Sequence, residues 1–349
     1  MIIDCNIHHI PEDLFENEKM LKGFLASAPR GYGDIAYLGE TENGVRQVVI
    51  EKPKGYTNLN NVEGDYTLEK KLQAMDENGV DVGLLRVAPV WSEWLDLELC
   101  KMVNDSAAET CRRANGRLFA NAIVPPWNDK DNIYELERCI KELGCVGVQV
   151  ACHYGELYLD DEAFRPFFRA VDKMDIPVTV HHTPLPVQWQ SIYEYKNLRR
   201  ELGRIIDQST AVGRELFSGM FDECPNLKLI HTMLGGNWFA NYHIMAPTKF
   251  KKPEATSDRL DTSGSERIQQ YLKNNIYFDL THPASWGKKI IECAIETCGA
   301  DHMLFGSTFP VFYNWMSDGI AFMKSLDVTA EEYELMMSGN AKRLFHLKV

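Results

Sequence analysis

The chain has 349 residues and a formal net charge of -13, with 45% hydrophobic and 25% charged residues. This length fits one large barrel or two ordinary domains, and the composition is that of a folded globular protein. The negative charge excludes nucleic acid and anionic membranes as expected partners, because both repel an acidic surface. No segment approaches the roughly 20 apolar residues that a membrane span needs.

The nine cysteines are scattered and include no C-x-x-C pair. An odd number of scattered cysteines indicates buried free thiols, not a disulfide framework or a zinc ribbon. The first residues have neither the basic region nor the apolar core of a signal peptide. We therefore expect a cytoplasmic protein.

A short apolar strand is predicted at residues 2–4, and the polar residues Asn6, His8 and His9 follow at its C-terminal end. Residues two apart on an extended chain point the same way, so Asn6 and His8 are expected to face one common space. A short helix is predicted over residues 11–20.

Residues 21–66 are rich in glycine, tyrosine and asparagine, with one hairpin-like piece at 46–51. Because this segment is too long for an ordinary connection, we interpret it as an insertion lying over the mouth of the domain. After it, an amphipathic helix is predicted over residues 67–78, capped by Thr67 and ended by Gly79.

From there, helices and short apolar strands alternate to the end of the chain. The further strands are predicted at residues 80–86, 118–124, 146–150, 176–182, 227–231, 276–279 and 303–306. The helices between them are predicted at residues 99–113, 131–143, 163–174, 198–221, 266–273 and 288–297.

Eight apolar strands separated by helices are typical of a buried parallel sheet, and eight such units fit a closed (β/α)8 TIM barrel. We expect one domain over residues 1–349. The alternative, an open doubly wound sheet, has little support because no G-x-G-x-x-G motif follows any strand.

In such a barrel the active site lies at the C-terminal ends of the strands. Seven of the ten histidines fall at these predicted positions, and imidazole serves as a metal ligand or as a general acid and base. The polar residues predicted there are Asn6, His8, His9, Arg86, Asn121, Gln149, Cys152, His153, His181, His182, His231, Thr232, Asp279, His282, Ser307 and Thr308.

Among the histidines, His8 and His181 close two strands with nothing else polar to explain them, which favours a functional role. For their neighbours His9 and His182, a structural hydrogen bond is expected. For His231, a functional role and a core histidine with satisfied hydrogen bonds are equally compatible with the sequence.

Arg86 ends the second strand, where its guanidinium could clamp a substrate carboxylate in bidentate geometry. The structural alternative is an ion pair with a nearby acid. Asp279 could orient a histidine or act as a base, and the sequence does not separate these roles from a buried structural acid.

Several segments are similar to one known family. They are residues 75–81, 136–150, 157–166, 176–181, 225–236 and 304–310. Through them the chain resembles the amidohydrolase superfamily, in the branch of aminocarboxymuconate semialdehyde, resorcylate and carboxyvanillate decarboxylases. The resemblance covers nearly the whole chain outside residues 21–66. It implies a barrel that acts on small aromatic or muconate-type acids with one divalent metal, usually zinc or manganese, and often as a dimer.

The chain departs from the family pattern at three positions of the implied metal site. The first-strand motif, His-x-His or Glu-x-His in the family, is Asn6-Ile7-His8 here. The family's catalytic histidine before Gly-Gly falls on Met233, and the aspartate of its Gly-Ser-Asp-x-Pro turn falls on Thr308. The histidine of the fifth strand is kept as His181.

Of the implied metal-site positions, only His8 and His181 therefore remain. A stable zinc site needs three or more good ligands, and threonine, methionine and asparagine are poor substitutes. We expect a reduced or absent metal site and assign no cofactor. The alternative is one zinc or manganese ion held by His8 and His181, with help from His231 or His282.

The leading hypothesis is a non-redox decarboxylase, a carboxy-lyase, of a small aromatic or unsaturated carboxylate. The alternatives are a metal-independent hydrolase of a lactone, ester or activated ring, and a non-catalytic homologue or subunit. The catalytic candidates are His181, His8, His231 and Asp279. The substrate-binding candidates are Arg86, Asn6, Thr308 and His282, with Asn6 and Thr308 as donors to a developing oxyanion. A homodimer is the assembly that the resemblance implies.

Overall fold

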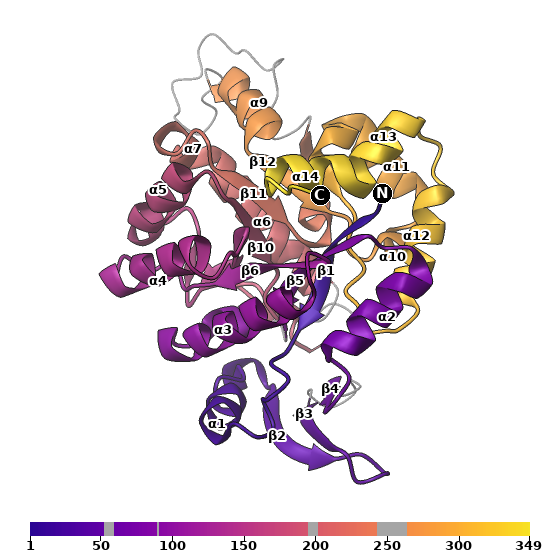
Figure 1. The fold of residues 1–349 in the computed structure, drawn as a ribbon. Helices are drawn as coiled ribbons and strands as arrows, with labels where there is room; N and C mark the ends of the chain where they lie inside the picture. The colour runs from indigo at the N-terminus through magenta and orange to yellow at the C-terminus, as the bar shows by residue number, and fades with distance from the viewer. Residues whose placement is uncertain (52–58, 89–90, 195–201, 243–263) are drawn as a thin grey trace.

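The computed structural model describes residues 1–51, 59–88, 91–194, 202–242 and 264–349. Eight parallel strands form one sheet surrounded by helices (Figure 1), which confirms the predicted (β/α)8 barrel. In sheet order the strands are β1 (Ile3–His9), β5 (Val82–Val87), β6 (Leu118–Ile123), β7 (Gly147–Ala151), β10 (Pro177–His181), β11 (Lys228–His231), β12 (Ile276–Asp279) and β13 (Met303–Leu304).

Backbone hydrogen bonds between β1 and the segment after β13 close the ring. Cys5 N donates to Phe305 O at 2.9 Å, Thr308 N to Asn6 O at 2.7 Å, and His8 N to Phe309 O at 2.7 Å. The first and last strand ends thus become neighbours, and Thr308 lies beside β1.

Helices α2 (Leu68–Asn78), α3 (Leu97–Arg113), α4 (Lys130–Lys141), α5 (Arg165–Met174), α9 (Gly264–Asn274) and α11 (Lys288–Cys298) occupy predicted intervals with small shifts at their ends. The other outer helices are α6 (Gly203–Phe217), α7 (Met220–Glu223), α10 (Pro283–Trp286), α12 (Trp315–Lys324), α13 (Ala330–Glu334) and α14 (Asn340–Leu344). Among the described helices, none has the length and apolar composition to cross a bilayer.

The capping residues of α2 act as the sequence predicts. The Thr67 side chain accepts the backbone N–H of Lys70, and Gly79 ends the helix with a φ of 66°. A side-chain oxygen at the N-cap satisfies a helix N–H that otherwise has no partner, and glycine adopts the left-handed conformation without steric cost.

Two predicted helices have different bounds in the structure. Helix α1 (Glu18–Ala26) starts near the end of the predicted interval 11–20 and runs beyond it, because Asn17 caps it by accepting the N–H of Met20. The predicted helix 198–221 is divided into α6 and α7, and Gly219 lies between them with a φ of 76°. Its first positions, 198–201, lie outside the described residues.

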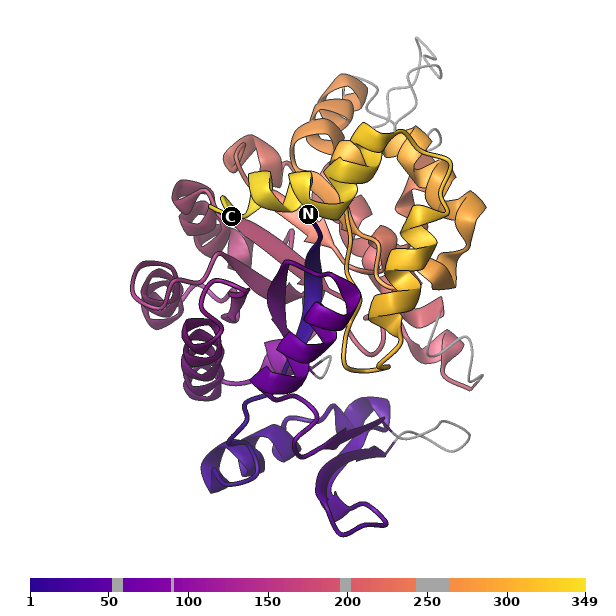
Figure 2. The ribbon, with the colours of Figure 1, turned by 45° about the vertical axis from the view of Figure 1, so that its right-hand side comes forward.

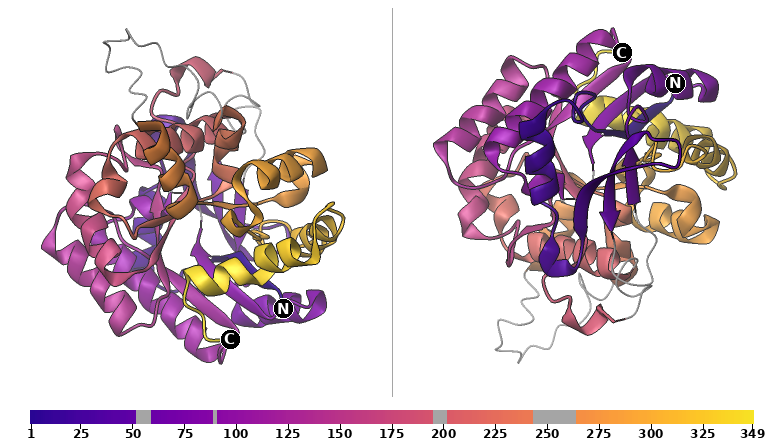
Figure 3. Two further views of the ribbon diagram at one scale, coloured as in Figure 1. Left: turned by 90° about the horizontal axis from the view of Figure 1, so that it is seen from above. Right: turned by 90° about the horizontal axis from the view of Figure 1, so that it is seen from below.

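The insertion contains an antiparallel sheet of β2 (Ile35–Glu40), β3 (Arg46–Glu51) and β4 (Leu59–Val62). With α1, this sheet stands below the barrel in Figures 1 and 2, and the view from below shows it crossing the barrel end toward which β1 runs (Figure 3). Helix α14 crosses the opposite end. A second, two-residue pairing of β8 (His153–Tyr154) with β9 (Leu157–Tyr158) has no counterpart in the prediction.

The barrel interior has an apolar layer at its N-terminal end. Its buried members include Ile3, Cys5, Val82, Leu84, Ile230, Leu304, Ala341, Leu344 and Phe345. Helix α14 contributes two of these side chains, so it closes this end of the barrel. Polar side chains then occupy the other end, beneath the insertion.

Candidate active site

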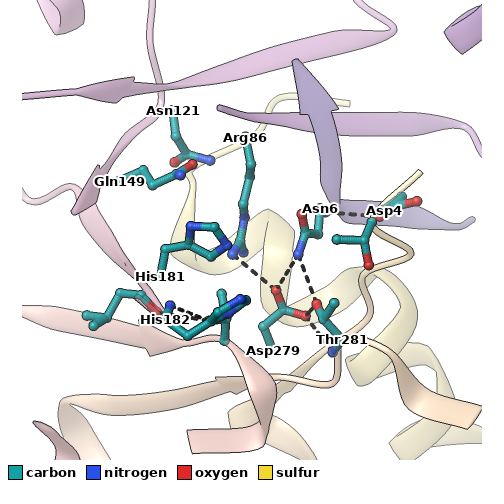
Figure 4. A network of polar contacts seen from close by, with 12 residues as sticks. Asp4, Asn6, Arg86, Asn121, Gln149, His181, His182, Asp279 and Thr281 are labelled. Carbon is teal, nitrogen blue, oxygen red and sulfur yellow. Dashed lines mark hydrogen bonds and ion pairs between the residues drawn. The ribbon is translucent and has the colours of Figure 1, made fainter. Parts of the chain in front are cut away.

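Six strands each contribute a polar side chain to the barrel interior (Figure 4). They are Asn6 on β1, Arg86 on β5, Asn121 on β6, Gln149 on β7, His181 on β10 and Asp279 on β12. None of these six residues is more than 3% exposed. The structure thus brings together six of the sixteen strand-end residues that the sequence singles out, in an enclosed polar site.

Arg86 is fully buried and forms an ion pair with Asp279. Its Nη1 lies 3.1 Å from Asp279 Oδ2, and the two side chains are 1% and 0% exposed. None of its three guanidinium nitrogens, Nε, Nη1 and Nη2, has a hydrogen-bond partner among the described residues, so the contact with Asp279 is an ion pair alone. One carboxylate therefore neutralises the guanidinium without using its hydrogen-bonding capacity, and a guanidinium has five N–H donors.

Asp279 is held from several directions. Its Oδ2 accepts a hydrogen bond from Nδ2 of Asn6 at 3.2 Å and forms the ion pair with Arg86. Its Oδ1 accepts the backbone N–H of Thr281 at 2.9 Å and the Thr281 hydroxyl. Asp279 thus pairs with Arg86, and its contacts do not favour the predicted role as a catalytic base.

Asn6 uses its amide group differently from the prediction. Its Nδ2 donates to both Asp279 and Thr281 Oγ1, the latter at 3.0 Å, so both amide hydrogens are taken. The group has no hydrogen left for a substrate oxyanion, and Asn6 instead positions Asp279. The pairing follows from the barrel closure, which places β1 between β5 and the last strands.

Glu93 is a site residue that the sequence reasoning missed. It lies on the short 3-10 helix η2 (Ser92–Trp94) and is 1% exposed. Its Oε1 lies 2.5 Å from Nδ1 of His181 and also accepts Nε2 of Gln149. Gln149 is itself fixed to the backbone of Val87 by two hydrogen bonds of 3.1 Å.

The Glu93 contact defines the chemistry of His181. With Nδ1–H donated to the carboxylate, the tautomer is fixed and Nε2 is the reactive nitrogen. A carboxylate in this position also compensates the charge of the imidazolium, as in hydrolase triads. His181 is thereby equipped to donate and accept a proton at Nε2.

His8 is buried without a hydrogen-bond partner at either ring nitrogen among the described residues. Burial lowers its pKa well below 6.5, and the nearby cationic groups His181, His282 and Arg86 act in the same direction. His8 is therefore a neutral imidazole near pH 7. It can hydrogen-bond a substrate but carries no stored proton.

Thr308 and His282 contact each other at the rim of the site. The Thr308 hydroxyl lies 2.5 Å from Nδ1 of His282, whose ring packs against Trp315 at a centroid distance of 3.8 Å. The Thr308 hydroxyl therefore already has a partner, His282, and is not an open donor at the barrel centre.

His182, next to His181, donates its backbone N–H to the Thr232 hydroxyl at 3.1 Å.

His231 lies outside this group. Its Nδ1 is 2.8 Å from Gln208 Oε1 and its Nε2 is 2.7 Å from Glu215 Oε2. Both partners belong to α6, so the ring points out of the barrel and joins β11 to that helix. Adjacent strand residues point to opposite faces, and the geometry favours the alternative of a core histidine with satisfied hydrogen bonds.

An aromatic cluster lies beside the Glu93–His181 pair. Tyr32 of the insertion packs against Trp94 and Trp189, with ring centroids 6.1 and 5.6 Å apart. Trp94 is fixed by a 2.8 Å hydrogen bond from its Nε1 to His153 O. Such a cluster offers stacking and edge contacts to a flat ring.

The side chains present do not fit a divalent metal. Across the described ranges of the chain, no three histidine, cysteine, aspartate or glutamate side chains are placed to hold an ion. Asp279 faces Arg86, and the Thr308 hydroxyl faces His282, so His8 and His181 are the ligands that remain at the implied positions. Two imidazoles fall short of the ligand number that zinc sites have.

Comparison with known proteins agrees with the motifs and the barrel. The profile of the amidohydrolase family matches residues 3–347. The gamma-resorcylate decarboxylase of Rhizobium sp. is 29% identical over 313 residues, covering 82% of this chain and 92% of that protein.

Two solved structures share the fold. A 2,6-dihydroxybenzoate decarboxylase complexed with 2,6-dihydroxybenzoate aligns over 99% of both chains, with a TM-score of 0.70 and 22% identity. The 5-carboxyvanillate decarboxylase of Novosphingobium aromaticivorans, solved with bound manganese, aligns over 99% of this chain and 97% of that chain, with a TM-score of 0.76 and 21% identity.

Proposed function

This chain belongs to the amidohydrolase family, and we propose from that premise that it is a non-redox decarboxylase of a small aromatic or unsaturated carboxylate. The match over residues 3–347 confirms the family that the sequence motifs predict. The gamma-resorcylate decarboxylase relative supports the reaction class, and the aromatic cluster around Tyr32 and Trp94 supports a flat substrate.

The observation that carries the proposal is the buried Arg86 guanidinium with open donors. An ionised side chain inside a protein needs a partner for each donor, because an unpaired buried donor costs free energy. Asp279 supplies only one contact, to Nη1. A substrate carboxylate that accepts from the remaining guanidinium N–H groups would complete the hydrogen bonding in the bidentate geometry that arginine favours.

Substrate binding would then place the reacting carbon near His181. Figure 4 shows the His181 ring and the Arg86 side chain pointing into the same interior space. His8, neutral and close enough to both groups for their charges to lower its pKa, can hydrogen-bond a ring hydroxyl. The walls that exclude water are the aromatic side chains of the mouth.

In the chemical step, His181 as imidazolium donates its Nε2 proton to the carbon that carries the carboxylate. The bond between that carbon and the carboxylate breaks, its electron pair returns to the ring, and carbon dioxide leaves. Solvent restores the proton on His181, so one proton is consumed per turnover. Glu93 compensates the imidazolium charge before the transfer.

The test is carbon dioxide release from a panel of acids that includes salicylate, 2,6-dihydroxybenzoate and 5-carboxyvanillate. The parent protein is expected to release carbon dioxide and decarboxylated product in equal amounts. The Arg86→Ala variant should lose at least about 100-fold in kcat/KM, and millimolar guanidinium in the buffer should restore part of it.

Arg165→Lys serves as the matched control. Arg165 is also a buried arginine paired with an acid, Glu223 at 3.2 Å, but it lies on α5 outside the barrel. Full turnover by a folded Arg86→Ala variant, or ester hydrolysis without release of carbon dioxide from any acid, would refute the proposal.

A further inference from the structure

We propose that Arg86 supplies, from inside the protein, the positive charge that a divalent metal would otherwise supply in this barrel, and that the site excludes such an ion. The inference rests on the proposed function only for its catalytic consequence. The charge and the metal affinity of the site can be measured without any substrate.

The first support is that Asp279, the carboxylate nearest to Arg86, has other partners at both oxygens. These oxygens accept hydrogen bonds or an ion pair, from Arg86, Asn6 and Thr281. Oε1 of Glu93 accepts from His181 and Gln149, and its Oε2 has no hydrogen-bond partner among the described residues. A metal would have to displace a cation or an amide to gain Asp279, and Glu93 alone would offer it one open oxygen.

The second support is the position of the guanidinium. Arg86 on β5 is the register partner of His8 on the neighbouring strand β1. A dication coordinated by His8 would be repelled by this guanidinium, in an interior that screens charge poorly. The guanidinium and a metal ion therefore compete for one region of the barrel.

The third support is the backbone at position 308. Thr308 has a φ of 64°, a left-handed conformation that β-branched residues rarely adopt and that aspartate or asparagine tolerates better. A carboxylate could thus be placed here without backbone change. The hydroxyl found at this position instead bonds His282.

The consequence is a site whose positive charge is permanent. An arginine side chain stays protonated over the whole working pH range and cannot be removed by a chelator. It also differs from a metal in its chemistry, because it hydrogen-bonds a carboxylate but provides no open coordination position.

The experiment measures Mn²⁺ and Zn²⁺ binding directly. Protein purified without chelator is analysed for metal content, then stripped and titrated with each ion by calorimetry. The parent is expected to hold far less than one equivalent and to show no saturable site at micromolar concentrations. One tightly bound equivalent in the parent would overturn the inference.

Two engineered proteins then separate the effect of the Arg86 charge from the effect of the metal ligands that are absent at positions 6 and 308. Asn6→His with Thr308→Asp restores ligands while Arg86 stays; the same pair with Arg86→Ser removes the guanidinium as well. The triple variant should bind Mn²⁺ near one equivalent, and the double variant should bind at least about 100-fold more weakly. Equal affinities, or no binding by a folded triple variant, would refute the exclusion by Arg86.

As a control, Thr308→Asn replaces Thr308→Asp in both engineered proteins. Asparagine shares the backbone tolerance but lacks the charge, so these variants should gain much less affinity for Mn²⁺.

The failure of one proposal can be distinguished from the failure of the other. A parent protein that decarboxylates only when loaded with metal contradicts this inference and leaves the proposed reaction intact. A metal-free parent without activity on any acid contradicts the reaction alone.

Discussion

Two buried carboxylates, Asp279 and Glu93, each compensate a basic side chain in the barrel interior. Asp279 faces Arg86 and Glu93 faces His181, with both acids no more than 1% exposed. Removing one partner of such a pair leaves an uncompensated charge and costs about 3–5 kcal/mol. The two pairs have different roles in the proposed reaction. Asp279 holds the permanent cation Arg86 in place, whereas Glu93 orients and stabilises His181, which gains and loses a proton.

Glu93→Gln tests the second pair. Glutamine keeps an oxygen for Nδ1 of His181 but removes the negative charge, so the imidazolium loses its compensation. We expect kcat to fall about 10- to 100-fold and the alkaline limb of the pH–rate profile to move to lower pH.

The control is Glu215→Gln, which makes the same change in the pair that His231 of β11 forms with Glu215 of α6. It should alter stability without moving the pH–rate profile. An unchanged profile in Glu93→Gln, or an equal change in both variants, would assign Glu93 a purely structural role.

At the scale of elements, sequence patterns predict the strands and their C-terminal polar residues. Apolar runs of four to seven residues between helices locate the barrel strands β5, β6, β7 and β10 to β13, and Arg86, His181 and Asp279 follow directly from these strand ends. Strand position alone therefore recovers most of the enclosed polar site.

Two parts of the site could not be obtained this way. Glu93 lies on η2, in a loop where no periodicity marks which acid turns inward. His231 ends a mostly apolar strand, and a strand buried on both faces gives no sign of which neighbour faces the axis. Only the contact with α6 settles its direction.

Helix α2 carries a buried lysine that makes stability depend on pH. Burial lowers the pKa of Lys71 from 10.5 to about 7, although the nearby acids Glu12 and Glu69 oppose this. Between these values the unfolded chain binds a proton that the folded chain does not, so the folded state gains stability as pH rises.

We therefore expect the unfolding free energy of the parent, relative to Lys71→Met, to rise by about 3 kcal/mol from pH 7 to pH 10. Urea unfolding at a series of pH values measures this difference. Lys70→Met, at the exposed neighbouring lysine that pairs with Asp65, should show no such pH dependence. A Lys71→Met difference that stays flat with pH would contradict the assignment.

At the scale of the whole molecule, the insertion and the barrel together form the mouth. The insertion contributes Tyr32, the barrel loops contribute Trp94 and Trp189, and their rings pack together above the site. The length of the segment 21–66 predicts an insertion. The orientation of its side chains cannot be predicted from the sequence, because it depends on contacts with distant loops.

Tyr32→Ala tests this contribution to substrate binding. Loss of one aromatic wall should raise KM for an aromatic acid about tenfold while kcat changes little, since the ring of Tyr32 contributes stacking surface and no proton transfer. Tyr37→Ala, at a 42% exposed tyrosine of the same insertion, should leave KM unchanged. Equal effects of both substitutions would indicate a general disturbance of the insertion.

The most direct measurement is a reaction of the chelator-treated parent protein with an aromatic acid in D2O, followed by mass spectrometry and NMR of the product. A barrel that uses Arg86 for charge and His181 for the proton should release carbon dioxide without added metal. The product should carry one deuterium at the carbon that bore the carboxylate. Turnover that appears only after Mn²⁺ or Zn²⁺ is added, or a product that has gained oxygen from water in place of losing carbon dioxide, would contradict it.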